Sequence, residues 1–350
     1  MKVGLIGPYP PPRGGISIHV ERLAQALRAQ GIAVTVFAIP KKIDKIGRLG
    51  KKITAITWLM HFIFCPQMDI LHIHLSNWRD RAVIILIARM RKIKTVVTVH
   101  SLRDELEQMP MMQAAYMRLV MRQADAIISV GPKENNKLAS KFGSSANLRM
   151  INPFIAPKIG KTELLQSIQN FMNRHSFIIS ANGSNMNFFQ GQDVYGLDML
   201  VELCFRLTKD YDVGFIFCLT RVTDPAYLQK IHNSIRELHL EASFLLVCDS
   251  VELWPILQQS QLFVRPTCTD SYGISIAEAI TLGIPSIASD VCQRPEGTIL
   301  FANRDGDDLY NKVCQVMSDY AKYKKLLENV LVPDCSTEII KLYRELLSTF

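Results

Sequence analysis

Two carboxylates stand eight residues apart in the stretch PTCTDSYGISIAEAITLGIPSIASD, residues 266–290. They are Asp270 and Glu278. The largely apolar run 274–282, which contains Glu278 and ends before Gly283 and Pro285, predicts a helix. Carboxylates that follow a strand and flank a helix N-terminus can accept hydrogen bonds from sugar or ribose hydroxyls, while the helix N-terminus binds a phosphate. The structural alternative is that Ser275 and Glu278 form a capping box and Asp270 is an exposed turn acid.

Two further features have residue types suited to ligand binding. Gly14 and Gly15 end the loop GPYPPPRGG and begin a predicted helix, so that backbone N–H groups can approach an anion, although a turn with positive φ would also favour glycine. His100 ends the apolar strand TVVTVH, at the rim where α/β sheets bind ligands, although a strand-end histidine is often only a polar terminus. His72 and His74 alternate on another strand, and two histidines without a third ligand nearby do not predict a zinc site.

The elements that must position these residues follow a doubly wound α/β pattern in two series. In the first, strands are predicted at 2–7, 33–39, 70–74, 95–100 and 126–130. In the second, strands are predicted at 177–181, 213–218, 243–247, 262–265 and 286–288, with helices at 197–207, 225–238, 253–259 and 274–282. We therefore expect an N-terminal domain over 1–155 and a C-terminal domain over 176–333, with 152–175 as linker. Ligands would bind between the carboxyl ends of the two sets of strands.

Composition limits the class of protein. With 48% hydrophobic and 21% charged residues in 350, the chain can bury a sizeable interior. Eight cysteines form no CxxC pair, which favours free thiols in a reducing compartment over metal or disulfide use. The chain opens directly into KVGLIG, which predicts a first strand and not a signal peptide. The sequence thus predicts a cytoplasmic location.

Charge is divided unevenly along the chain. Residues 1–160 hold 24 Lys and Arg against 9 Asp and Glu, a net charge of +15, whereas residues 161–350 hold 16 against 23, a net charge of −7. Six basic residues precede the apolar run ITAITWLMHFIFC at 53–65, which is too short to span a bilayer. They are Lys41, Lys42, Lys45, Arg48, Lys51 and Lys52. This composition fits either docking onto anionic lipid or a solvated basic loop before a core helix. No zinc-finger, RNP or KH signature accompanies the charge, so nucleic acid is not an expected partner.

The opening stretch, together with RPEG at 294–297, resembles the donor-site signature of GT-B glycosyltransferases of family 4. The likeness extends over nearly the whole chain. The Gly14-Gly15 loop and the helix after it, the strand ending at His100 and the segment ADAIISV at 124–130 are similar to the family's N-terminal domain. The segment LYREL at 342–346 resembles its terminal helix, so that residues 334–350 are expected to cross back to the first domain.

The resemblance implies a role for each matching residue. Glu278 would accept hydrogen bonds from the ribose, and Asp270 would contact the donor sugar. Ser271, Tyr272, Gly273 and Ile274 would bind the donor through backbone N–H groups. Gly14 and Gly15 would admit the diphosphate, and His100 would approach the reacting carbon. Family members commonly have proline at position 275, which suits the first helical turn better than an N-cap.

The chain also departs from the family pattern. Asp270 is one methylene shorter than the glutamate that is commoner there. Asn182 and Tyr195 align where the family has an arginine and a lysine for the diphosphate, and the charge that develops on the leaving group must still be stabilised. Arg265 is our preferred substitute because it ends the strand that leads to Asp270; Arg221 and helix dipoles are the alternatives.

The resemblance therefore implies a retaining, metal-independent glycosyltransferase with no cofactor beyond its donor substrate. It would move a sugar from a nucleoside diphosphate sugar to a hydroxyl of a saccharide acceptor, in cell-surface polysaccharide assembly such as O-antigen, capsule or exopolysaccharide. If the basic element docks, the acceptor is lipid-linked and the protein is peripheral at the cytoplasmic face of the inner membrane. The alternatives are a nucleotide-sugar 2-epimerase of the same fold and a catalytically reduced partner subunit.

Overall fold

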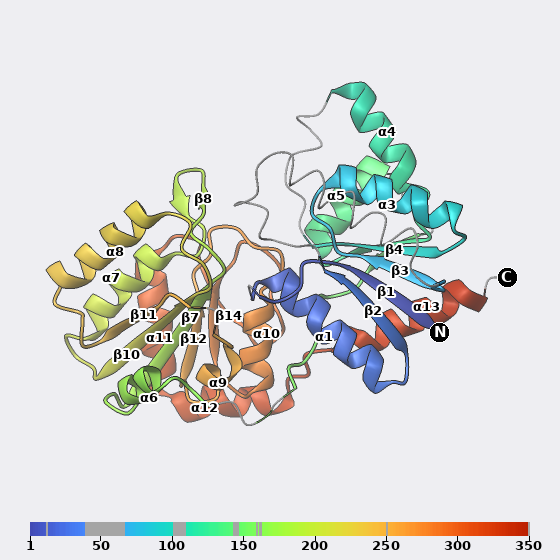
Figure 1. Ribbon diagram of the computed structural model, residues 1–350. Helices are drawn as coiled ribbons and strands as arrows, with labels where there is room; N and C mark the ends of the chain where they lie inside the picture. The colour runs from blue at the N-terminus through green and yellow to red at the C-terminus, as the bar shows by residue number, and fades with distance from the viewer. Residues whose placement is uncertain are drawn as a thin grey trace. The chain divides into compact units, whose positions relative to one another are not determined.

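The computed structural model of the chain forms two α/β units (Figure 1). It describes residues 1–11, 13–38, 67–100, 110–142, 147–158, 160, 163–249 and 251–348. Unit 1 consists of Met1–Pro10, Ile16–Ile155 and Asp334–Phe350, and unit 2 consists of Pro11–Gly15 and Ala156–Pro333. The basic residues 41–52 and the apolar run 53–65 lie outside the described residues.

Unit 1 is built on a parallel sheet of six described strands. They are β1 (Lys2–Gly7), β2 (Ala33–Ala38), β3 (Ile70–Ile73), β4 (Lys94–Val99), β5 (Ala126–Ser129) and β6 (Leu148–Met150). Their order in the sheet is β2-β1-β3-β4-β5-β6. The chain runs outward from β1 to β2 and then returns to the other side of β1, so the strand order reverses between β1 and β3. Ligands of doubly wound proteins bind outside the carboxyl ends of the strands at such a switch point.

Helices cover both sides of this sheet. They are α1 (Gly15–Ala29), α3 (Trp78–Met90), α4 (Met111–Met121), α5 (Pro132–Phe142) and α13 (Ser336–Ser348). On one side α1 and α13 share a core with β1, to which Leu23 and Tyr343 contribute fully buried side chains. On the other side α3 and α4 pack with the sheet through residues such as Ile85 and Met121. Burial of apolar surface on both faces explains why the central strands are continuously hydrophobic.

Unit 2 has a second six-stranded parallel sheet. Its strands are β7 (Phe177–Gly183), β10 (Val213–Leu219), β11 (Phe244–Val247), β12 (Leu262–Arg265), β13 (Ser286–Ser289) and β14 (Ile299–Phe301). The order β11-β10-β7-β12-β13-β14 is that of a Rossmann sheet and reverses between β7 and β12. A short antiparallel hairpin, β8 (Phe188–Phe189) and β9 (Gln192–Asp193), follows β7. Both units therefore have the doubly wound parallel architecture that the sequence predicts.

The helices of unit 2 flank this sheet. They are α6 (Gln166–Met172), α7 (Leu197–Leu207), α8 (Pro225–Glu237), α9 (Trp254–Leu257), α10 (Ile274–Thr281), α11 (Gly306–Ser318), α12 (Tyr320–Leu326) and the 3₁₀ helix η3 (Leu327–Asn329). The expectation that 152–175 is only a linker is wrong. That range contains α6, which buries Ile168 and Phe171 against Ile178 and Ile216 of the sheet. Among the described residues, no helix combines the length and the apolar character that crossing a bilayer requires.

Candidate active site

The predicted donor-site residues of unit 2 gather where its strand order reverses. Asn182 lies near the carboxyl end of β7, and Arg265 is the last residue of the neighbouring strand β12. Asp270 follows β12 in the loop that leads into α10. Because β7 and β12 flank the switch point, side chains at their carboxyl ends lie where a doubly wound sheet binds its ligand.

Asp270 is held between two arginines. Its Oδ2 accepts hydrogen bonds from Arg265 Nε at 2.6 Å and from Arg294 Nη1 at 2.8 Å. Its Oδ1 accepts a hydrogen bond from the backbone N–H of Ser271 at 3.0 Å. Burial would raise the pKa of the Asp270 carboxyl, but the charges of Arg265 and Arg294 and their hydrogen bonds outweigh burial and hold that pKa far below its usual range. Asp270 is therefore an ionised anchor and not a proton donor.

The two arginines differ in how many of their nitrogens are engaged. In Arg294, Nε donates to Ser289 O, Nη1 to Asp270, and Nη2 to the hydroxyls of Thr267 and Ser289. In Arg265, Nε and Nη1 are engaged, whereas Nη2 has no hydrogen-bond partner within the described parts of the chain. Arg294 thus positions Asp270, and Arg265 retains donors for a ligand. Two guanidinium groups around one carboxylate leave a net positive charge that suits an anion.

The residues that stand where the family has cations support Arg265 instead. Arg265 Nη1 donates to Asn182 Oδ1 and to Ser275 Oγ, both at 3.2 Å. The guanidinium carbon lies 5.7 Å from the centroid of the Tyr195 ring, a cation–π distance. The Tyr195 hydroxyl is 2.5 Å from Ser184 Oγ. Arg265 therefore occupies the centre of the cluster, whereas Arg221, the alternative, is exposed in the turn after β10.

The loop before α10 requires glycine at position 273. Gly273 is the N-cap of α10 and has a φ of 91°, a conformation that other residues rarely adopt. A Cβ there would lie 2.6 Å from Ile276 Cδ1 and 3.1 Å from Arg294 Nη1. The capping-box interpretation of Ser275 and Glu278 is wrong, because the helix begins at Ile274 and Ser275 lies inside its first turn.

Glu278 lies in the second turn of α10 and is only 4% exposed. It lies three positions after Ser275, so the two side chains share a face of the helix. Ser275 contacts Arg265, and that face is therefore directed toward the cluster. Of the predicted backbone donors in the loop, the Ser271 N–H is already engaged by Asp270. Tyr272 and Gly273 connect Ser271 to Ile274, the first residue of α10. The N–H groups of the first residues of a helix have no partner within the helix.

The glycine pair lies at the beginning of α1. Gly15 is the first residue of that helix, and neither Gly14 nor Gly15 is among the described glycines with positive φ. The interpretation as a turn that needs positive φ is therefore wrong. A Cβ at Gly15 would meet no atom within 4 Å. Neither positive φ nor packing within the described chain therefore demands glycine at position 15.

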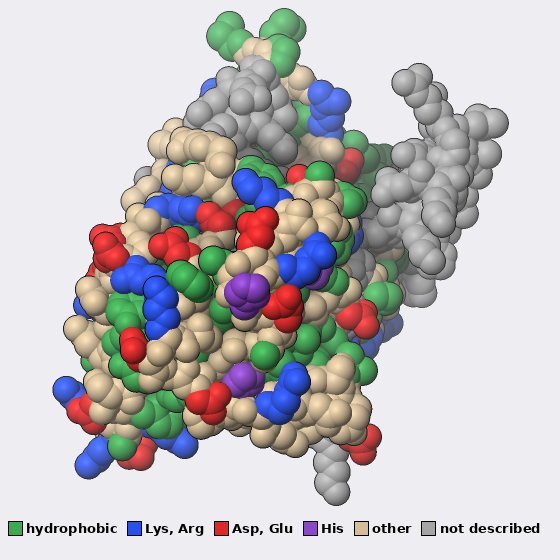
Figure 2. All heavy atoms as spheres, turned by 90° about the vertical axis from the view of Figure 1, so that its left-hand side faces the viewer, with side chains coloured by type: hydrophobic (Ala, Val, Ile, Leu, Met, Phe, Trp, Pro, Cys, Tyr) green, Lys and Arg blue, Asp and Glu red, His purple; other side chains and the backbone are tan. Residues whose placement is uncertain are grey.

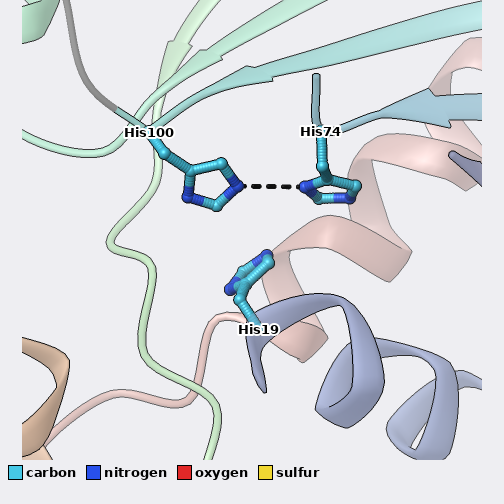
Figure 3. Close-up of side chains that lie close together, drawn as sticks. All are labelled: His19, His74 and His100. Atoms are coloured by element: carbon cyan, nitrogen blue, oxygen red, sulfur yellow. Dashed lines mark hydrogen bonds between the residues drawn. The ribbon is translucent and has the colours of Figure 1, made fainter. Parts of the chain in front are cut away.

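His100 lies in unit 1 directly after β4 and belongs to a cluster of histidines (Figure 3). Its Nε2 is 3.1 Å from Nδ1 of His74, which directly follows β3. The ring of His19, from α1, lies 5.0 Å from that of His100 and 5.2 Å from that of His74, between ring centroids. His72 has different partners, Tyr343 Oη and Thr98 Oγ1, each at 2.6 Å. The rings of His72 and His74 lie 4.1 Å apart between centroids, but the sequence did not indicate that His74 also meets His100 and His19.

Two residues of these clusters were missed by sequence reasoning. Arg294 is part of the RPEG segment that supports the family resemblance, but nothing in its spacing assigns it to Asp270. His19 is four residues from Gly15 on α1, and only the packing of that helix beside β1 brings it to the switch point of unit 1. The parallel strand order is the one signal that could have grouped it with His74 and His100.

Both halves of the chain match family models of glycosyltransferases. The family model Glycosyltransferase Family 4 matches residues 13–158, and the model Glycosyl transferases group 1 matches residues 188–319. No curated protein matches the sequence significantly.

Among solved structures, three similar ones cover both units. HepE of Anabaena, in complex with UDP and glucose, has a TM-score of 0.70 and 14% identity, with 100% of both chains covered. Sucrose-phosphate synthase of Thermosynechococcus elongatus has a TM-score of 0.71 and 17% identity, again with 100% of both chains covered. WaaG, a glycosyltransferase involved in lipopolysaccharide biosynthesis, has a TM-score of 0.64 and 13% identity, with 93% of each chain covered. Glycosyltransferase models match the two halves of the chain in order, and the chain shares its fold with these proteins. The chain is therefore an enzyme that belongs to the GT-B glycosyltransferases of the family 4, group 1 type.

Proposed function

We propose that the enzyme transfers a sugar from a nucleoside diphosphate sugar to a hydroxyl of a saccharide acceptor, with retention of the anomeric configuration. The observation that carries this proposal is the Arg265–Asp270–Arg294 cluster at the switch point of unit 2, beside the N-terminus of α10. HepE, which shares the fold, has been crystallised with UDP and with UDP-glucose, so the donor we propose is of the same chemical class.

Each residue of the cluster has a role in this proposal. Arg265 Nη2 donates to the diphosphate, whose negative charge grows as the bond from the anomeric carbon breaks. The first N–H groups of α10 add their partial positive charge. Glu278 accepts hydrogen bonds from the ribose hydroxyls, and Asp270 Oδ1 has remaining lone pairs for a hydroxyl of the donor sugar. Gly14 and Gly15 admit the diphosphate, and His100 approaches the donor sugar.

In this mechanism the charge of the diphosphate is neutralised by Arg265 and by the helix N-terminus, and no divalent cation at the diphosphate is required. The acceptor hydroxyl forms the new bond to the anomeric carbon as the bond to the diphosphate breaks. The electron pair of the broken bond leaves with the diphosphate, whose oxygen accepts the proton of the acceptor hydroxyl. Arg294 does not touch the donor. It keeps Asp270 ionised and in place, which in turn fixes the orientation of Arg265.

We also propose a place for the reaction in cell-surface polysaccharide assembly, supported by the shared fold of WaaG. The enzyme would act in the cytoplasm and contact anionic lipid at the inner membrane. The described part of unit 1 adds support through α3 and α4, where Met90, Met111 and Met112 are each at least 84% exposed. Apolar side chains stand at the tip of α4, near the top of Figure 2.

Exposed Arg89 and Lys92 flank Met90 at the end of α3, and exposed Arg118 and Arg122 lie toward the C-terminal end of α4, whereas Met111 and Met112 lie at its start. Basic and apolar side chains together favour binding to anionic headgroups. The face of unit 2 that carries α7 and α8 is different, because acidic and basic side chains are interspersed over it (Figure 2). A hollow of about 570 Å³ on unit 2, lined in part by Asp193, Asp198 and Tyr227, contains none of the predicted donor-site residues.

Calorimetry with UDP and a panel of nucleotide sugars tests the donor site. Glu278→Ala should abolish measurable donor binding, whereas Glu328→Ala, a change of an exposed glutamate in η3, should leave it unchanged. Unchanged donor affinity in Glu278→Ala would contradict the site. A donor at 100 times its Kd adds about 2.7 kcal/mol to stability, so thermal shifts can rank the panel first.

Product analysis tests the reaction itself. With donor and a saccharide acceptor, NMR of the product should show the anomeric configuration of the donor. Inversion would contradict the retaining mechanism. Incubation with the donor alone should give at most slow hydrolysis, and a 2-epimerised nucleotide sugar would show that the enzyme is an epimerase instead.

A further inference from the structure

Three imidazoles converge at the switch point of unit 1. His74 directly follows β3 and His100 directly follows β4, while His19 extends from α1, the helix that follows β1 (Figure 3). His74 is fully buried, and His19 and His100 are 3% and 9% exposed. The order of this sheet reverses between β1 and β3. The histidines therefore lie where doubly wound sheets bind ligands.

The ring nitrogens of this cluster are only partly engaged within the protein. His19 Nδ1 is 2.8 Å from the carbonyl oxygen of Pro153, and because a carbonyl only accepts, this nitrogen must carry the proton. His19 Nε2 then presents a lone pair, and it has no hydrogen-bond partner among the described residues. His74 Nε2 is likewise buried and unpartnered within the described parts of the chain. A metal ion bound to His19 Nε2 would give this buried nitrogen the partner that it lacks within the described chain.

The tautomer of His19 is the one that metal-binding histidines have. In metal sites the ring nitrogen that does not bind the ion commonly donates to a carbonyl or carboxylate, which fixes the ring and raises the basicity of the ligating nitrogen. The Pro153 carbonyl has this position relative to His19. In Figure 3 the His19 ring lies beside the His74–His100 pair, and a ring nitrogen points toward it.

The spacing of the three side chains suits a small divalent ion. One nitrogen from each ring can be chosen so that all three lie within 4.8 Å of one another. Zn–N bonds of about 2.0–2.1 Å at tetrahedral angles place neighbouring nitrogens about 3.4 Å apart. His74 Nδ1 and His100 Nε2 are 3.1 Å apart, close to that value. Since no separation is larger than 4.8 Å, each exceeds that value by at most about 1.4 Å, which side-chain rotation of one histidine can close.

The positive charge of Arg81 acts on both His74 and His100, so a fourth ligand with negative charge would be preferred beside the three neutral imidazole rings that a metal ion requires.

We propose that His19, His74 and His100 form a binding site for a divalent transition metal ion, Zn²⁺ in the first place, with an open fourth position. Three histidines with one open position are a ligand set that zinc adopts in proteins. The ion would join α1 to the ends of β3 and β4. This site lies outside the Arg265–Asp270–Arg294 cluster of unit 2, but it shares His100 with the proposed donor contacts. Binding of the ion itself does not require sugar transfer.

Metal titration of the full-length protein tests the site. The chain is first stripped with a chelator and then titrated with Zn²⁺ by calorimetry, and with Co²⁺, whose visible absorption reports tetrahedral coordination. We expect one ion per chain. Each of His19→Ala, His74→Ala and His100→Ala should weaken binding at least tenfold, since even second-shell changes cost 10- to 100-fold. His74→Gln keeps the size of the buried side chain if His74→Ala does not fold.

Two controls separate this site from other metal-binding groups. His232→Ala removes an exposed histidine of α8, and Cys248→Ser removes an exposed thiol, and neither change should alter the high-affinity ion. Zn²⁺ should also raise the melting temperature of the natural chain and not that of the His19→Ala variant. Absence of a high-affinity ion, or binding that survives all three histidine substitutions, would overturn the proposal.

The donor site gives an independent readout. Glu278→Ala should bind the metal as the natural chain does while losing the nucleotide sugar. If the natural chain binds nucleotide sugar but no metal, the cluster proposal fails and the proposed transfer stands. If the natural chain binds metal but no nucleotide sugar, the proposed transfer fails and the cluster proposal stands.

Discussion

Arg265 Nε and Asp270 Oδ2 lie 2.6 Å apart, and Arg294 contacts the same carboxylate oxygen from 2.8 Å. One acid thus orients two guanidinium groups at the carboxyl end of β12. The acid that the family resemblance assigns to the donor sugar thus also holds Arg265, the arginine that we propose for the diphosphate.

The first prediction concerns the removal of that charge. Asp270→Asn leaves two guanidinium groups without their counter-charge in a mostly buried site. Because breaking a buried ion pair from one side costs about 3–5 kcal/mol, we expect a clear loss in the free energy of unfolding. Urea denaturation measures it. Asp198→Asn, which alters a more exposed ion pair with Arg304, should cost less. Equal losses in the two variants would contradict the central role of Asp270.

The second prediction is a dependence of stability on pH. The pKa of Asp270 is lower in the folded chain than the value of about 3.9 for a free side chain, so the unfolded state binds a proton first as the pH falls. The stability that Asp270 contributes is complete above about pH 4 and is lost progressively below it. Denaturation at several pH values should therefore show a shallower acid decline in Asp270→Asn than in the natural chain. Parallel declines would show that Asp270 is not the titrating group.

The third prediction separates the two arginines. Arg265→Lys loses the planar fork and should weaken UDP binding about 10- to 100-fold, the loss of one or two charge-assisted hydrogen bonds. Arg294→Lys removes contacts to Thr267 and Ser289 and should mainly lower the melting temperature. Calorimetry and thermal unfolding of both variants measure the difference. Identical loss of UDP affinity at similar stability would contradict the division of roles.

The fourth prediction concerns the glycine that precedes α10. Gly273→Ala combines an unfavourable positive φ with a contact of 2.6 Å to Ile276. Gly191→Ala is a matched control, because Gly191 also has a positive φ but a Cβ there would meet nothing within 4 Å. The control should lose only the strain, about 1 kcal/mol. Gly273→Ala should lose more stability and also affinity for UDP, because the loop carries Asp270.

The fifth prediction tests membrane contact. The double substitution Met111→Ser and Met112→Ser removes two exposed apolar side chains from the start of α4. It should reduce flotation of the protein with vesicles that contain anionic lipid, and the remaining association should weaken as salt rises. Met150→Ser, an exposed methionine on β6, is the control. Equal binding to neutral and anionic vesicles would contradict the electrostatic part of the proposal.

Much of the architecture could be predicted from hydrophobic pattern. Strands such as β12 and helices such as α7 were predicted at their observed bounds, because an apolar run between polar turns leaves few alternatives. The helix α6 was missed since it is short and polar, with only Ile168, Phe171 and Met172 buried. Long-range contacts, and not local periodicity, hold it in place.

The candidate site could be predicted less completely. Asp270, Glu278 and Arg265 were found through their spacing after a strand. The partnership of Arg265 with Asn182 joins residues 83 positions apart, and that of Arg294 with Asp270 joins residues 24 positions apart. Such pairs depend on which strands are neighbours in the sheet. The histidine cluster depends on the same information, since His19, His74 and His100 come from three separate elements.

The helix α13 gives unit 1 an order of assembly during synthesis. Its Tyr343 is fully buried in the core beside β1 and contacts His72, yet the whole of unit 2 is translated before it. Residues 156–333 are all synthesised before α13, whereas the apolar surface of unit 1 that α13 covers beside α1 stays uncovered until residues 336–348 have been made. A ribosome-bound chain stopped before residue 336 would therefore expose apolar surface of unit 1 to chaperones.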